Sequence, residues 1–119
     1  MRNVPYTMIN AVDTVTQTGA PVFAGQTVSA SFTSVFGDAT AAGTIQVQES
    51  NELPVGDPSK YVPSNGSFSN IPNATATVTS GAAPAIVITT LCCQYVRVVF
   101  TYSSGGSSTI LVNASFLSV

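Results

Sequence analysis

Glycine and proline recur at short intervals along the whole chain, and this spacing leaves little room for helices. The 119 residues include nine glycines and seven prolines. Proline lacks a backbone donor and clashes with the preceding helical turn, and glycine loses the most conformational entropy when a helix orders it. The longer intervals between them alternate apolar with polar residues, which is the period of a half-buried β-strand. An all-β fold is therefore predicted.

The same alternation places the strands individually. They are expected at residues 12–16, 27–36, 44–49, 74–79, 85–90, 94–102 and 110–116. In strand 27–36, Val28, Ala30 and Phe32 share one face, and Ser34 interrupts the pattern, which predicts a bend or bulge near residues 34–35. The run Ser-Ser-Gly-Gly-Ser-Ser at residues 103–108 is predicted to be a flexible hairpin loop between the last two strands.

Seven or eight short strands with closely spaced turns indicate an antiparallel β-sandwich of jelly-roll or immunoglobulin-like topology. The length is that of a single domain. Residues 13–119 are expected to form the sandwich, with a long loop excursion at about residues 50–73, where proline, asparagine, glycine and serine are concentrated. Residues 1–12 are expected to form an N-terminal arm that lies on a neighbouring molecule.

Charge is scarce in this chain. Three basic and five acidic residues make up 7% of the sequence, whereas soluble domains average about 25%. Three scattered cations form no basic patch, which argues against nucleic acid as a partner. The apolar fraction is too high, and the net charge of −2 too small, for a disordered chain. A monomeric cytosolic enzyme is also a poor fit, because so few charges leave little to keep its surface soluble.

The reactive side chains offer little for catalysis. The sequence has no histidine and no tryptophan, so the commonest general base and metal ligand is missing. We therefore expect neither enzymatic activity nor a cofactor. The one acidic cluster, Glu49, Glu52 and Asp57, is a weak candidate for a calcium loop. A glycosidase pair is not favoured, because such a cleft normally carries aromatic platforms and the chain has no tryptophan. Its spacing matches no established ligand loop, and a solvated loop is the favoured interpretation.

Adjacent cysteines cannot form a disulfide framework. Cys92 and Cys93 would point to opposite faces of a strand, so they are predicted to be two small apolar strand residues, one of them in the core. An intermolecular disulfide is the alternative. Two free thiols fit assembly in a reducing cytoplasm.

Arg97 and the four tyrosines each allow two interpretations. Arg97 either contacts a ligand on an exposed sheet face, or covers neighbouring strand residues while its head meets Glu49 or another carboxylate. The second interpretation is favoured. The tyrosines either stack on sugars or fill a core or an interface, and again the second is favoured. They are Tyr6, Tyr61, Tyr95 and Tyr102.

No apolar run reaches the length of a signal peptide or a membrane span. Neither export nor a membrane partner is therefore expected. This argues against a bacterial surface or pilus subunit, which needs export.

Two segments resemble small virion proteins of tailed phages. Residues 43–52, Gly-Thr-Ile-Gln-Val-Gln-Glu-Ser-Asn-Glu, are similar to a strand and turn of those proteins. Residues 94–114 are similar to their late hairpin, with Tyr-Val-Arg-Val-Val-Phe-Thr, a Ser/Gly loop and Ile-Leu-Val in order. Together with the earlier strand at 28–36, the matching pieces cover about a third of the chain. The late hairpin also resembles the closing strands of discoidin-like, galactose-binding sandwiches.

The chain departs from this pattern in two places. Lys60-Tyr61-Val62 stands where those phage proteins often carry tryptophan, and Cys92-Cys93 stands where polar or turn residues are usual. Only the architecture and the virion setting are therefore carried over, and no binding residue is.

The resemblance implies a structural protein of a phage particle. The expected role is capsid decoration or cementing, through contacts with the major capsid protein and with copies of itself. The expected location is the virion, assembled in the host cytoplasm. The alternative is a tail- or fibre-associated module that recognises host surface carbohydrate at the loops near residues 50–73 and 103–108.

Overall fold

The computed structural model describes residues 2–119, and these form nine strands and one short 3-10 helix. All predicted strands except 12–16 have a counterpart. The elements are β1 (Arg2–Val12), β2 (Gln17–Thr18), β3 (Val22–Phe23), β4 (Thr27–Phe36), β5 (Ala42–Ser50), η1 (Asn65–Ser67), β6 (Ser69–Val78), β7 (Ile86–Ile88), β8 (Tyr95–Ser104) and β9 (Thr109–Ser118).

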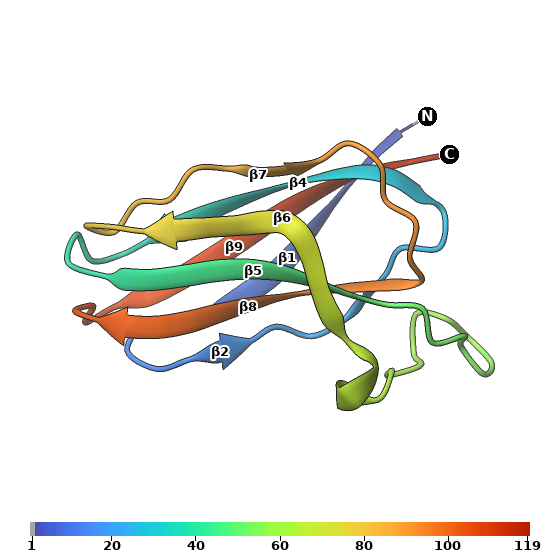
Figure 1. Cartoon of the computed structure of the whole chain (residues 1–119), viewed down its shortest axis with the longest axis horizontal. Helices are drawn as coiled ribbons and strands as arrows, with labels where there is room; N and C mark the ends of the chain where they lie inside the picture. Colours follow the sequence, from blue (N-terminus) through green and yellow to red (C-terminus); the bar gives the residue numbers. More distant parts are fainter. Residues whose placement is uncertain (1) are drawn as a thin grey trace.

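The strands form two antiparallel sheets that face each other (Figure 1). One has the order β1-β9-β4-β7, and the other has the order β2-β8-β5-β6, with β3 also paired to β8. The strand pairs are nested: β5 pairs with β6, β4 with β7, β2 and β3 with β8, and β1 with β9. A chain folded back on itself in this way and rolled into two sheets is a jelly roll. The predicted β-sandwich is confirmed, and of its two predicted topologies the structure has the jelly roll.

The core lies between the sheets, and strand parity supplies it. Along β8, Val96, Val98 and Phe100 point inward and are fully buried. Along β9, Ile110, Val112, Ala114 and Phe116 also point inward and are buried, as the alternation predicted. Aromatic rings link the two sheets: Phe36 of β4 lies 5.6 Å from Phe100 of β8, edge to face.

The N-terminal residues do not form an arm. Residues 2–12 are strand β1, paired with β9 along its length, and Met1 lies outside the described residues. Met8 and Ile9 are buried, and the Tyr6 ring lies 4.9 Å from that of Phe116. Pro5 made the segment look irregular, but proline is tolerated on an edge strand, because its missing donor would face solvent. The edge strand predicted at 12–16 is not formed: Val12 ends β1, and residues 13–16 connect β1 to β2.

The hairpin loop predicted at 103–108 is a loop only at residues 105–108, because β8 extends to Ser104, and it is not a hairpin, because β8 and β9 belong to different sheets. It crosses from one sheet to the other, and contacts hold it in place. The Gly106 amide donates to Thr40 Oγ1 at 3.0 Å, and the Ser108 amide donates to Asp13 Oδ1 at 2.9 Å. Asp13 is completely buried in this crossing, so the predicted flexibility is replaced by a fixed contact between three loops.

The irregularities of strand pairing also differ from the prediction. The β4–β9 register shifts between Thr27 and Ser29, and no shift occurs near residues 34–35 in the part of the pairing that is described. A larger irregularity separates Gln46 from Gln48 in the β5–β6 pairing. There the Gln46 amide nitrogen lies 3.1 Å from the carbonyl oxygens of both Ile71 and Ala74. This satisfies acceptors that the ladder leaves free, and it lets β6 extend back from the predicted residue 74 to residue 69.

Candidate interaction surfaces

The long loop between β5 and β6 covers one end of the outer face of the five-stranded sheet. Tyr95 is on the outward side of β8, yet it is 1% exposed. Its hydroxyl donates to the Pro58 carbonyl at 2.7 Å, and its ring lies 5.4 Å from that of Phe23 and 6.1 Å from that of Tyr61. The predicted excursion is therefore an ordered flap with its own small aromatic core, and it spans residues 51–68, because β6 begins at Ser69.

The Glu52 carboxylate holds separate parts of this flap together. It accepts hydrogen bonds from the Tyr61 hydroxyl and from the amide and hydroxyl of Ser64, the latter two at 2.9 Å. These bonds stabilise the ionised form, and they lower the pKa of Glu52 from 4.5 to about 2, with the bond from Tyr61 contributing most. The same bond raises the pKa of Tyr61.

We expect the contribution of Glu52 to stability to depend on pH. A carboxylate whose folded-state pKa is depressed stabilises the fold fully above its unfolded-state value, here 4.5, and loses this contribution as the pH falls towards 2. Urea unfolding of the wild type and of Glu52→Gln should therefore give midpoints that differ above pH 4.5 and converge towards pH 2. Glu52→Gln should also lower the pKa of Tyr61 in an ultraviolet titration. A difference in midpoint that does not change with pH would contradict this stabilising role of the Glu52 carboxylate.

The candidate calcium loop is not assembled. Glu52 is occupied by Tyr61 and Ser64, and Asp57 accepts from the amide and hydroxyl of Ser59 at 3.0 and 2.8 Å. Within residues 2–119, no three acidic or cysteine side chains lie close enough together to hold a metal ion. Asp57 thus closes a local turn, as aspartate commonly does.

Arg97 has a structural environment. Its guanidinium lies 4.0 Å from the centre of the Phe68 ring, and its Nε donates to Gln48 Oε1 at 2.8 Å. A second nitrogen donates to Asn65 Oδ1. In the described chain the side-chain amide oxygens of Gln48 and Asn65 are the partners of Arg97, in place of the predicted carboxylate. Arg97 therefore fastens the flap to the sheet.

The tyrosines also have contacts within the chain. Tyr6 packs on Phe116, and Tyr61 of the flap packs on Tyr95 of β8. The Tyr102 hydroxyl donates to the Gly105 carbonyl at 2.9 Å. Tyr95 is buried, and Tyr6 and Tyr102 are partly buried against the core, which agrees with the favoured interpretation as far as the core is concerned.

The two cysteines lie in the connection from β7 to β8 and not on a strand. Cys92 is exposed and Cys93 is buried, and both are free thiols. Burial raises the pKa of Cys93 to about 12, so this thiol is inert near neutral pH. The prediction that one cysteine lies in the core and the other outside it is confirmed, but both lie on a loop and not on a strand.

The four-stranded sheet has an outer face without a single charged side chain among the described residues. Strand pairing aligns its outward positions in rows across β1, β9, β4 and β7. We call this surface the uncharged face. Its residues are Asn3, Pro5, Thr7, Asn10, Val12, Ser29, Ser31, Thr33, Val35, Val87, Thr109, Leu111, Asn113, Ser115 and Leu117.

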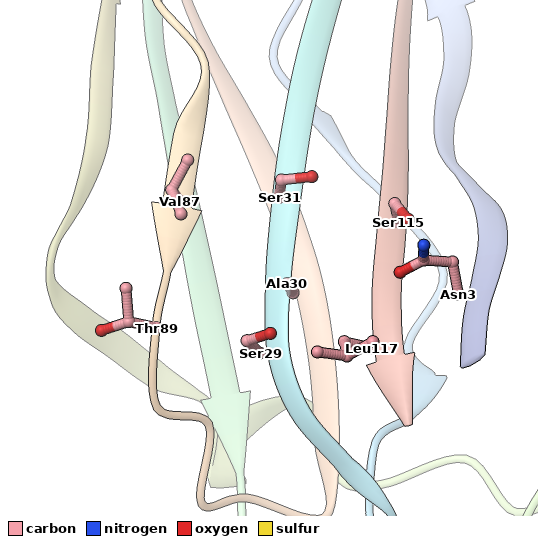
Figure 2. Close-up of a pocket in the computed structure, with 8 residues that line it drawn as sticks. All are labelled: Asn3, Ser29, Ala30, Ser31, Val87, Thr89, Ser115 and Leu117. Carbon is pink, nitrogen blue, oxygen red and sulfur yellow. The ribbon is translucent and has the colours of Figure 1, made fainter. Parts of the chain in front are cut away.

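A hollow of about 290 Å³ lies on the uncharged face. Figure 2 shows its lining from four neighbouring strands, with hydroxyls of Ser29, Ser31 and Ser115 beside the apolar side chains of Val87 and Leu117. Val87 is 66% exposed, and Val35 on the same face is 55% exposed. The surface is thus a mixture of small hydroxyl groups and exposed aliphatic groups.

The eight charges lie elsewhere. Asp13 and Asp38 are in loops, and Arg97 is on the outer side of the five-stranded sheet. The remaining charged residues lie at strand ends and in the flap: Arg2, Glu49, Glu52, Asp57 and Lys60. The charged residues of the described chain thus lie away from the outer face of the four-stranded sheet, which carries none.

Two features of these surfaces were not predicted from the sequence. Asp13 is buried, and one of its carboxylate oxygens has no hydrogen-bond partner in residues 2–119. Leu53, Val55 and Val62 project from the flap with 71–81% exposure. The sequence contains a signal for the exposed flap residues only: three apolar residues stand in a segment that is predicted to be a loop.

The two loops proposed to share a carbohydrate site lie at opposite ends of the sandwich (Figure 1). The flap follows Ser50, which pairs with Tyr95 at the start of β8, whereas residues 105–108 follow Ser104 at the end of β8. Nine residues of strand separate them, which is about 30 Å. A shallow site formed jointly by both loops is therefore ruled out by the topology.

The fold is shared with a solved structure. The chain is similar to the crystal structure of SPBc2 prophage-derived protein YomS, with a TM-score of 0.60 and 11% identity, over 98% of this chain and 94% of that chain. No protein-family model and no curated protein matches the chain. At this identity the likeness shows a common fold and transfers no site residue. The structural neighbour is of phage origin, like the proteins that the sequence resembles.

The described residues contain no helix that is long and apolar enough to cross a membrane.

Proposed function

We propose that this protein is a non-enzymatic structural component of a phage particle that acts through protein–protein contacts. The observation that carries the proposal is the uncharged face, fifteen outward positions on one sheet without a charge in the described chain. Charged residues are depleted in interface cores, because burying an unpaired charge is costly. The jelly-roll fold, which occurs in viral capsid domains, and a structural neighbour of prophage origin support the same role.

The specific role that we propose is decoration or cementing of the capsid. Such a protein needs rigid, partner-covered surfaces and no reaction centre. Its partners would be the major capsid protein and copies of itself, and its location the virion. The flap supports this role, because it presents Leu53, Val55 and Val62 from a loop that is already braced. A pre-ordered apolar loop binds a shell with little further loss of entropy.

The test is the abundance and position of the protein in purified phage particles. Quantitative mass spectrometry should find it in a fixed ratio to the major capsid protein, and immunogold labelling should mark the shell. Purified protein added to shells that lack it should bind and saturate. Its absence from particles would overturn the structural role, and labelling confined to the tail would overturn the decoration role.

The alternative, a tail- or fibre-associated module that recognises host carbohydrate, makes a different prediction. It requires selective binding on a glycan array, which a decoration protein should not show. No joint loop site supports it, so the ligand would have to bind at one end of the sandwich alone.

A further inference from the structure

We propose that the uncharged face binds the same face of a second copy of this chain, forming a two-fold symmetric dimer. The inference rests on the proposed function, because it takes this face as the surface through which the protein acts. It adds the identity of the partner and the strands that form the contact.

The charge distribution favours a second copy as the partner. In a two-fold interface the same patch meets itself, so any charge near the axis faces an identical charge. The uncharged face avoids this repulsion, since none of its fifteen described positions is ionisable. A partner with a charged surface would find no countercharge there.

The polar side chains of this face are of the kind that can pair with themselves. They are serines, threonines and asparagines, which all donate and accept hydrogen bonds, whereas carboxylates only accept and ammonium groups only donate. In residues 2–119 these side chains make no side-chain hydrogen bond within the chain. The outer side of the other sheet contrasts with this, because Gln48, Thr75 and Arg97 are already bonded there.

The size of the face is sufficient for a weak to moderate dimer. Strands β1, β4 and β9 contain 10–11 residues each, and β7 adds three. With strand spacings of about 4.8 Å and a rise of about 3.3 Å per residue, the flat area is about 500 Å² per copy, or about 1,000 Å² for the pair. That value reaches the lower bound of about 1,000 Å² for biological interfaces.

The relief of the face also suits self-association. Val35 is an exposed apolar side chain of β4 outside the hollow, and the hollow of about 290 Å³ between β7 and β1 is lined in part by the apolar side chains of Val87 and Leu117. A surface with both projecting and recessed apolar parts can interlock with its own copy.

The test is the molar mass of the full chain in solution, measured by sedimentation equilibrium over a range of concentrations. The wild type should show twice the chain mass. Thr33→Lys, at an exposed position of the uncharged face, should weaken the dimer about tenfold or more, because two lysines would be buried in one interface. Ser115→Lys on β9 is a second variant with the same expected effect.

Thr101→Lys is the matched control, since Thr101 is an exposed threonine on the outer side of the other sheet. It should dimerise like the wild type, and thermal melting should show that all variants are folded. A wild type that stays monomeric at about 1 mM, or variants Thr33→Lys and Thr101→Lys that dimerise equally, would overturn the inference. A monomer that is still found in particles would overturn the dimer alone, and a dimer that is absent from particles would overturn the proposed function alone.

Discussion

Replacing Phe116 with alanine is expected to lower the free energy of unfolding by about 3–5 kcal/mol. Phe116 is 1% exposed at the inner side of β9, between its partner strands β1 and β4. Its ring lies 4.9 Å from that of Tyr6 and 6.1 Å from that of Phe32. Removing it leaves a cavity that closely packed sheets cannot close, and the loss is a large part of the 5–15 kcal/mol that stabilises a typical domain.

Urea unfolding followed by tyrosine fluorescence or far-ultraviolet circular dichroism measures this loss. Leu53→Ala is the control, because Leu53 is 71% exposed, and its truncation should change stability by no more than about 0.5 kcal/mol. Similar losses for the two variants would show that Phe116 is not a central part of the core.

Gly105→Ala is expected to destabilise the fold by about 2–5 kcal/mol, the sum of two costs. Gly105 has φ +69°, a left-handed conformation that costs about 1–2 kcal/mol for alanine. A Cβ at this position would also lie 1.9 Å from the carbonyl oxygen of Thr40. Because that atom belongs to the backbone, the loop after β4 would have to move, which adds about 1–3 kcal/mol.

Gly56→Ala separates these two costs. Gly56 has φ +81°, but a Cβ there would meet nothing within 4 Å. Its substitution should therefore cost only the conformational part, about 1–2 kcal/mol. Equal urea midpoints for the two alanine variants would mean that the loop at 103–108 adapts freely, contrary to its close contact with Thr40.

Local alternation predicted much of the fold. Strand 27–36 was predicted to its last residue, and the inward residues of β8 and β9 are those that the period of two selects. The prediction succeeds because each strand buries one face against the same core, so buried and exposed residues alternate along the sequence. The arm prediction at 1–12 was wrong because alternation is interrupted there: a register shift between Thr7 and Ile9 puts Tyr6 and Ile9, three residues apart, on the same inner face.

The candidate site was less predictable. The sequence grouped Glu49, Glu52 and Asp57 by proximity, but the fold gives Glu52 to Tyr61 and Ser64, and Asp57 to Ser59. Arg97 was expected to find a carboxylate and is held by Gln48, Asn65 and Phe68. These partners lie up to 49 positions apart in the chain, and no local pattern reports contacts of that range.

The all-β class, the parity of the long strands and the scarcity of charge can all be predicted from the sequence, because each depends on composition or on adjacent residues. The jelly-roll topology, in which β1, β9, β4 and β7 are neighbours, depends on contacts between distant segments and is therefore seen only in the folded chain. An uncharged surface exists only when strands distant in sequence are placed side by side. The pairing of β1 with β9 and of β4 with β7 brings such strands together, and their uncharged outward positions then form one continuous face.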